Sequence, residues 1–285
     1  MPTRTIASPD KLAKACGWVG VVTLVLALGT MKAGDLRTRR PLPEGVKSAM
    51  LALELIRTPA VLDQIARPDE SGENLPAGIT ARRERAQLAR AIKVDFAFIG
   101  AYATFLTLMG LFGLYTLPSR LSALGLIVVC TAIGAAAFDI RENLAMLALL
   151  GHSLSAHPRS ASLVKWALLF TAVAGGAPVF IDGQATMFRR TLGFVGIALA
   201  LWAAGEGWFG VWKGDDRMIE TSATRLGQTF LLAVIFFLTR HPFREGVLPA
   251  LNRLAKWGPF TWVTDWPSKD QNGTVEPSVF DPPPK

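Results

Sequence analysis

The feature that most constrains this chain is a series of long stretches without a charged residue. The clearest is Phe96 to Leu117, 22 residues bounded by Asp95 on one side and by Pro118 and Arg120 on the other. A helix needs roughly 20 predominantly apolar residues to cross the hydrocarbon core of a bilayer. We therefore predict that this stretch is a transmembrane helix.

Five further apolar stretches with few charged residues predict an all-α polytopic integral membrane bundle. The six spans are expected at about residues 15–31, 95–117, 121–145, 164–182, 191–212 and 226–240. The last contains only 14 uncharged residues, Leu226 to Thr239. A re-entrant or interfacial helix is therefore the alternative there, although we expect a crossing in which the flanking arginines snorkel to the interface. The spans are expected to form one transmembrane domain, residues 1–266, followed by a polar, proline-rich and disordered tail, residues 267–285.

Composition agrees with a lipid environment and excludes several classes of protein. Hydrophobic residues make up 51% of the chain and charged residues only 18%, which is too apolar for an ordinary soluble domain. The net charge of +8 comes from Lys and Arg at the ends of apolar runs, where they meet lipid phosphates, so we expect no nucleic-acid partner. The two cysteines, Cys16 and Cys130, lie inside apolar runs and form neither a disulfide framework nor a metal cage.

The first loop, residues 32–93, is expected to lie outside the membrane and to carry short amphipathic helices. Thr58 and Pro59 are a helix start signal. The apolar face that follows consists of Val61, Leu62 and Ile65. We expect this helix to lie on the membrane surface. Farther along, Thr80 is expected to cap a basic helix that continues into the second span.

The second and third spans are predicted to form a tight antiparallel hairpin, because only Pro118 and Ser119 separate them. Residues equally far from the turn of such a hairpin lie at equal depth, since a helix rises about 1.5 Å per residue. Asp95 is 21 residues before Thr116, and Glu142 is 21 residues after Leu121. The acid at the start of the second span should therefore lie level with the acids late in the third.

These acids predict a polar cluster on one side of the bilayer. Asp139, Glu142 and Asn143 share one helix face, and Asp95 shares a face with Tyr102. With six spans, Glu206 falls on the same side. The candidate site residues are Asp95, Tyr102, Asp139, Glu142, Asn143 and Glu206.

The sequence leaves two interpretations of this cluster open. In one, the acids are interfacial and solvated and pair with basic residues between Arg82 and Lys93; in the other, they form a structural or functional polar pocket. We expect no catalytic residue, no metal ligand and no cofactor. A carboxylate-led divalent cation site at Asp95, Asp139 and Glu142 is the alternative.

Several of these residues also carry a resemblance. In order along the chain they are Leu53-Glu54-Leu55, Thr58-Pro59, a basic stretch, Asp95-Phe-Ala-Phe-Ile with Tyr102, and Phe138-Asp139-x-x-Glu142-Asn143. The pattern covers roughly residues 50–150 and resembles a family of uncharacterised bacterial multi-span membrane proteins with a D-x-x-E-N motif late in a transmembrane helix. The resemblance implies a helical bundle with the acid-rich hairpin as its hallmark. It also implies a multi-pass protein of the bacterial inner membrane, without implying an activity.

We expect a non-enzymatic membrane component whose acid-rich hairpin binds a partner, a lipid headgroup or a client at the membrane interface. A small-solute or ion transporter or channel is the first alternative, and a lipid-modifying membrane enzyme is the second. The expected partners are the lipid bilayer and a second protein or another copy of the chain.

Overall fold

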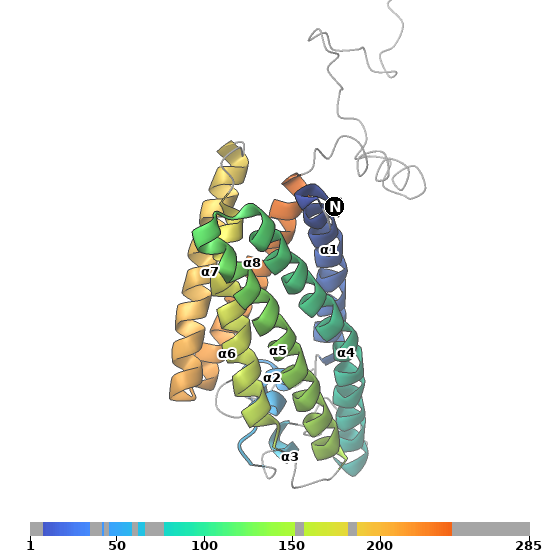
Figure 1. The fold of residues 1–285 in the computed structure, drawn as a ribbon. Coiled ribbons are helices and arrows are strands. Elements are labelled where there is room, and N and C mark those ends of the chain that lie inside the picture. The colour runs from blue at the N-terminus through green and yellow to red at the C-terminus, as the bar shows by residue number, and fades with distance from the viewer. Residues whose placement is uncertain are drawn as a thin grey trace, which may run out of the picture. The chain divides into compact units, whose positions relative to one another are not determined.

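The computed structural model of the chain is helical throughout the part that it describes. That part comprises residues 8–34, 42, 46–58, 62–65, 77–151, 157–181 and 187–240, all within one compact unit, Met1–His241. The elements, shown in Figure 1, are α1 (Pro9–Gly34), α2 (Ala49–Glu54), α3 (Leu62–Ile65), α4 (Ala77–Thr116), α5 (Ser119–Leu150), α6 (Pro158–Gly176), the 3-10 helix η3 (Ala177–Phe180), α7 (Met187–Lys213) and α8 (Asp216–Arg240).

Six of the described helices are long and apolar enough to cross a membrane, judged by length and composition. They are α1, α4, α5, α6 continued by η3, α7 and α8, and they coincide in order with the six predicted spans. This confirms the predicted all-α, multi-pass membrane bundle. The helices alternate in direction, so α1, α5 and α7 end at the same end of the bundle at which α4, α6 and α8 begin (Figure 1). We call this the acid end.

The sixth helix is longer than the sequence analysis predicted. α8 contains 25 residues and begins at Asp216 rather than near Leu226. The charges in the added part have partners, because Arg225 pairs with Glu206 on α7 and Glu220 accepts hydrogen bonds from the backbone of Lys47. Charges satisfied in this way let the helix extend beyond its uncharged stretch.

The predicted hairpin is formed by α4 and α5, of 40 and 32 residues. The basic stretch continues into the span as predicted, but α4 begins at Ala77, so Thr80 lies inside the helix and is not its cap. The two helices approach most closely at a pair of glycines. A Cβ added to Gly125 would lie 2.4 Å from the carbonyl oxygen of Gly110. This close backbone contact fixes how α4 and α5 are aligned.

The other close contacts also depend on small residues. A Cβ on Gly207 of α7 would lie 2.3 Å from the ring of Phe170 on α6. At the sequence Gly175-Gly176-Ala177-Pro178 the α-helix α6 gives way to the 3-10 helix η3. The glycines therefore allow aromatic side chains to lie against neighbouring backbones, as in many membrane bundles.

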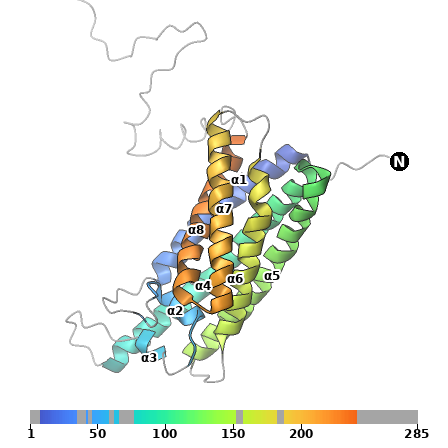
Figure 2. The ribbon, with the colours of Figure 1, turned by 90° about the vertical axis from the view of Figure 1, so that its left-hand side faces the viewer.

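The helices α1 and α8 pack closely in the half of the bundle far from the acid end. A Cβ on Gly17 would lie 2.9 Å from Leu238, and a Cβ on Gly20 would lie 2.5 Å from Val234. Figure 1 shows the two helices side by side at this upper end and apart at the lower, acid end, and Figure 2 shows the bundle turned by 90° from that view. α1 and α8 thus diverge toward the acid end.

The segment between α1 and α4 packs onto the acid end of the bundle. Leu53 and Leu55 near α2 and Ile65 on α3 are buried together with Leu88 of α4 and Met146 of α5. The prediction that the helix containing Leu62 and Ile65 lies on the membrane surface is therefore wrong. The apolar face is covered by protein rather than by lipid, because the long ends of α4 and α5 provide apolar partners for it.

Some predictions concern residues outside the described part. These are the C-terminal tail at 267–285, the domain boundary at 266, and Pro59 and Val61 of the first loop.

The glycine contact between α4 and α5 predicts the effect of adding one methyl group. Gly125→Ala should lower the free energy of unfolding by about 1–3 kcal/mol, because the new Cβ meets backbone atoms that move only if the helices separate. Gly100→Ala on α4 is the matched control, since a Cβ there meets nothing within 4 Å. Thermal unfolding in detergent measures both. A parent-like melting temperature for Gly125→Ala would show that the helices do not approach this closely.

Candidate functional site

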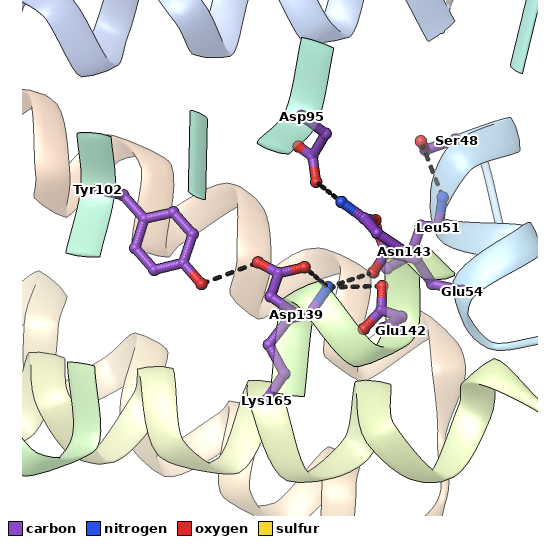
Figure 3. Close-up of polar contacts among 9 residues, drawn as sticks. All are labelled: Ser48, Leu51, Glu54, Asp95, Tyr102, Asp139, Glu142, Asn143 and Lys165. Atoms are coloured by element: carbon purple, nitrogen blue, oxygen red, sulfur yellow. Dashed lines mark hydrogen bonds and ion pairs between the residues drawn. The ribbon is translucent and has the colours of Figure 1, made fainter. Parts of the chain in front are cut away.

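The structure brings five of the six candidate residues together and adds two. Figure 3 shows the group, which we call the acid cluster. Its members are Glu54 on α2, Asp95 and Tyr102 on α4, Asp139, Glu142 and Asn143 on α5, and Lys165 on α6.

Lys165 is the centre of the acid cluster. Its Nζ lies 3.0 Å from Oε2 of Glu54, 3.3 Å from Oδ1 of Asp139 and 2.8 Å from Oε1 of Glu142. The lysine is 3% exposed and Glu142 is not exposed at all. A buried ammonium requires such partners, because removing an ion from water is otherwise very costly.

Two further hydrogen bonds join α4 to α5. The Nδ2 of Asn143 donates to Oδ2 of Asp95 over 2.8 Å, and the hydroxyl of Tyr102 donates to Oδ2 of Asp139 over 2.8 Å. Asp95 and Asn143 are nearly equally far from the hairpin turn, so the predicted depth match is confirmed. Tyr102 lies about one helical turn deeper than Asp139, and its long side chain reaches that carboxylate (Figure 3).

The structure decides between the two interpretations of the acids. Asp139 and Glu142 are buried, and their cation is Lys165 rather than a residue between Arg82 and Lys93. The interpretation of solvated, interfacial acids is therefore wrong for these two residues. Neither Lys165 nor Glu54 was among the predicted site residues. Lys165 follows the start of α6 by only seven residues, so in the sequence it resembles an ordinary interfacial lysine that bounds a span.

Glu206 is separate from the acid cluster. Its carboxylate pairs with Arg225 of α8, and that guanidinium lies over the ring of Trp202, 4.1 Å from its centre. Glu206 thus joins α7 to α8. The prediction that it shares a site with the hairpin acids receives no support from these contacts.

Glu54 reaches the acid cluster because α2 is held at both ends. Ser48 caps α2, and the backbone N–H groups of Lys47 and Ser48 donate to Glu220 on α8. After the helix, Arg159 of α6 donates to the carbonyl oxygen of Leu55 over 2.6 Å. α2 therefore bridges α8 and α6 across the acid end.

A cavity of about 340 Å³ begins at the acid cluster and extends between the helices. Five cluster members border it, Glu54, Asp95, Tyr102, Asp139 and Lys165. Its remaining walls are mainly apolar, and they include Leu24, Ala27 and Met31 of α1, Phe98, Phe105 and Leu106 of α4, Trp166 and Leu169 of α6, and Ala223, Leu226, Gly227 and Phe230 of α8. The cavity thus occupies the space where α1 and α8 diverge.

The acid cluster differs from a metal site. Within the described residues, no group of three or more His, Cys, Asp or Glu side chains is arranged to hold a metal ion. The ammonium of Lys165 already lies between Asp139 and Glu142, where the alternative of a divalent cation would require the metal.

Removing the central ammonium should destabilise the bundle strongly. Lys165→Met keeps a side chain of similar length but leaves three carboxylates facing one another, so we expect a loss of about 3–5 kcal/mol in unfolding free energy. Lys93→Met, on an exposed position of α4, is the control and should change stability little. Thermal unfolding measures the effect.

A second variant tests the cause of that loss. Adding Glu142→Gln to Lys165→Met removes one of the unpaired charges and should restore part of the stability. If the losses of unfolding free energy caused by Lys165→Met and by Glu142→Gln simply add in the double variant, Lys165 and Glu142 do not interact.

No family model, no curated protein and no solved structure matches the chain. The resemblance carried by residues 50–150 stays a prediction.

Proposed function

We propose that the protein is a non-enzymatic membrane component that binds a small amphipathic molecule. The apolar part of this molecule occupies the cavity, and its polar head lies at the acid cluster. The observation that carries the proposal is the cavity itself, which joins an apolar wall to a charged end. From the resemblance, we place this function in the inner membrane of a bacterium.

The size and lining of the cavity support a ligand rather than a packing defect. Well-packed interiors contain few voids larger than a water molecule, whereas ligand pockets measure roughly 300–1,000 Å³. At about 340 Å³ the cavity lies in the second range. Mostly apolar walls with a few convergent polar groups are typical of small-molecule sites.

The ligand gains access from the lipid, between α1 and α8. Gly227 and Met31 border the cavity from these two helices, and both are exposed. Met31 is 71% exposed, although it lies on a membrane-spanning helix. A molecule dissolved in the bilayer therefore reaches the cavity without crossing an aqueous phase.

Transport of the bound molecule is a second candidate, favoured by one observation. Asp139 and Lys165 are buried on membrane-spanning helices, and ionisable residues in such positions commonly mark pathways for ions or solutes. Flux of the ligand into liposomes that contain the purified chain would test this candidate separately from binding.

Filling the opening of the cavity tests the proposed function. Gly227→Leu adds a side chain where a Cβ meets nothing within 4 Å, so it should narrow the cavity without a clash. We expect the affinity for a single-chain amphiphile to fall about tenfold, equivalent to about 1.4 kcal/mol. Gly205→Leu on α7 is the matched control, since that position is equally open and does not border the cavity.

The measurement is quenching of Trp166 by an alkyl amphiphile that is brominated on the carbons next to its head, in lipid nanodiscs, because Trp166 lies beside Lys165 at the acid cluster. Trp166 borders the cavity, and Trp166→Phe identifies its contribution among the eight tryptophans of the chain. Equal quenching in Gly227→Leu and Gly205→Leu would refute binding in this cavity.

A further inference from the structure

The acid cluster contains more negative groups than positive ones. Four carboxylates, those of Glu54, Asp95, Asp139 and Glu142, surround the single ammonium of Lys165. Each of the three acids paired with Lys165 contacts it through one oxygen. The partner of Asp95 is a neutral amide, that of Asn143. The cluster therefore has room for additional positive charge.

Two buried acceptors in the cluster also lack a donor. Among the described residues, neither Oε2 of Glu142 nor Oδ1 of Asn143 has a hydrogen-bond partner. Both side chains are completely buried. Leaving a buried acceptor unsatisfied costs free energy, so native structures rarely keep one without a reason. Neither residue is among those that border the cavity, so these oxygens add to the negative potential of the cluster and do not contact a ligand in the cavity.

The aromatic residues beside the acids suit a cation as well. Phe98, Tyr102 and Trp166 border the cavity, and the rings of Phe98 and Tyr102 are 5.3 Å apart. Lys165 already lies with its Nζ 4.9 Å from the centre of the Trp166 ring. Aromatic faces attract ammonium groups, most strongly where water is excluded. Lys165 thus illustrates how this site holds an ammonium.

We infer that the ligand of the cavity is a cationic amphiphile whose ammonium head binds beside Asp95 and Glu54, two of the acids that line the cavity. Asp95 faces an amide, and Glu54 is the most exposed of the three acids paired with Lys165, with 15% of its side chain accessible. An anionic head would meet the three carboxylates that border the cavity, those of Glu54, Asp95 and Asp139, and be repelled. This inference rests on the proposed function and specifies the chemistry of its ligand.

The test compares amphiphiles that have the same alkyl chain and different head groups. Brominated dodecyl amphiphiles that carry a primary ammonium, a trimethylammonium, a sulfate or an uncharged sugar head are titrated against the full-length protein in phosphatidylcholine nanodiscs, with Trp166 quenching as the readout. We expect the ammonium heads to bind about tenfold tighter than the sugar head, and the sulfate to bind weakest. Equal affinities, or a preference for the sulfate, would overturn the inference.

Variants then locate the preference. Asp95→Asn should lower the affinity for the ammonium heads about tenfold more than it lowers the affinity for the sugar head. Glu54→Gln, on the more accessible α2, should also lower the affinity for the ammonium heads, to a smaller degree. This variant replaces Asp95→Asn in the test if Asp95→Asn does not fold. Asp215→Asn is the control, because Asp215 is exposed at the same end and caps α8 through bonds that asparagine also accepts. A loss of ammonium affinity in Asp215→Asn equal to that in Asp95→Asn would reduce the effect to surface charge and overturn the inference.

The outcomes separate the two proposals. If no amphiphile quenches Trp166, the proposed binding function fails and the inference fails with it. If the sugar-headed amphiphile binds as well as the ammonium compounds, binding stands and the cationic ligand is refuted.

Discussion

The rest of the structure depends on burying the ammonium of Lys165 inside a membrane bundle. Its three carboxylate partners come from α2, whose Glu54 is 111 residues from Lys165 in the sequence, and from α5, the helix that precedes α6, so the ion pairs join three separate helices. None of these groups is stable alone in a low-dielectric interior, because each needs the others to offset its loss of hydration. The cluster therefore ties the position of α2 to the alignment of α5 and α6.

Packing by small residues complements this electrostatic constraint. Glycines bring α4 against α5 and α7 against α6, and they bring α1 against α8 at the end of the bundle opposite the acids. The same glycines leave α1 and α8 free to diverge toward the acid end, where the cavity lies. A bundle that was packed tightly along its whole length would have no space next to its charges. The cavity and the cluster thus follow from one arrangement of the helices.

Much of the fold was predictable from the sequence, and the reasons are physical. Apolar runs give the six spans because the bilayer sets a minimum length, and the short turn at Pro118 makes the hairpin antiparallel. Helical rise alone then placed Asp95 level with the acids of α5, as its hydrogen bond with Asn143 confirms. By contrast, the last span was predicted to begin after Arg225, because the pairing of Arg225 with Glu206 depends on how α7 packs against α8 and could not be inferred from the sequence.

The two missed members of the cluster show where sequence reasoning ends. A lysine within two turns of a helix start is normally an anchor at the interface, and no periodicity distinguishes that role from the one Lys165 has. Glu54 belongs to a six-residue helix in a loop, whose position is set by Glu220 and Arg159 on distant elements. Because this same helix lies across the acid end and also contributes to the cavity wall, it links the charge of the cluster to the space for a ligand. A molecule bound there would act on Glu54 and Lys165 together, so binding and the stability of α2 should be coupled through one set of ion pairs.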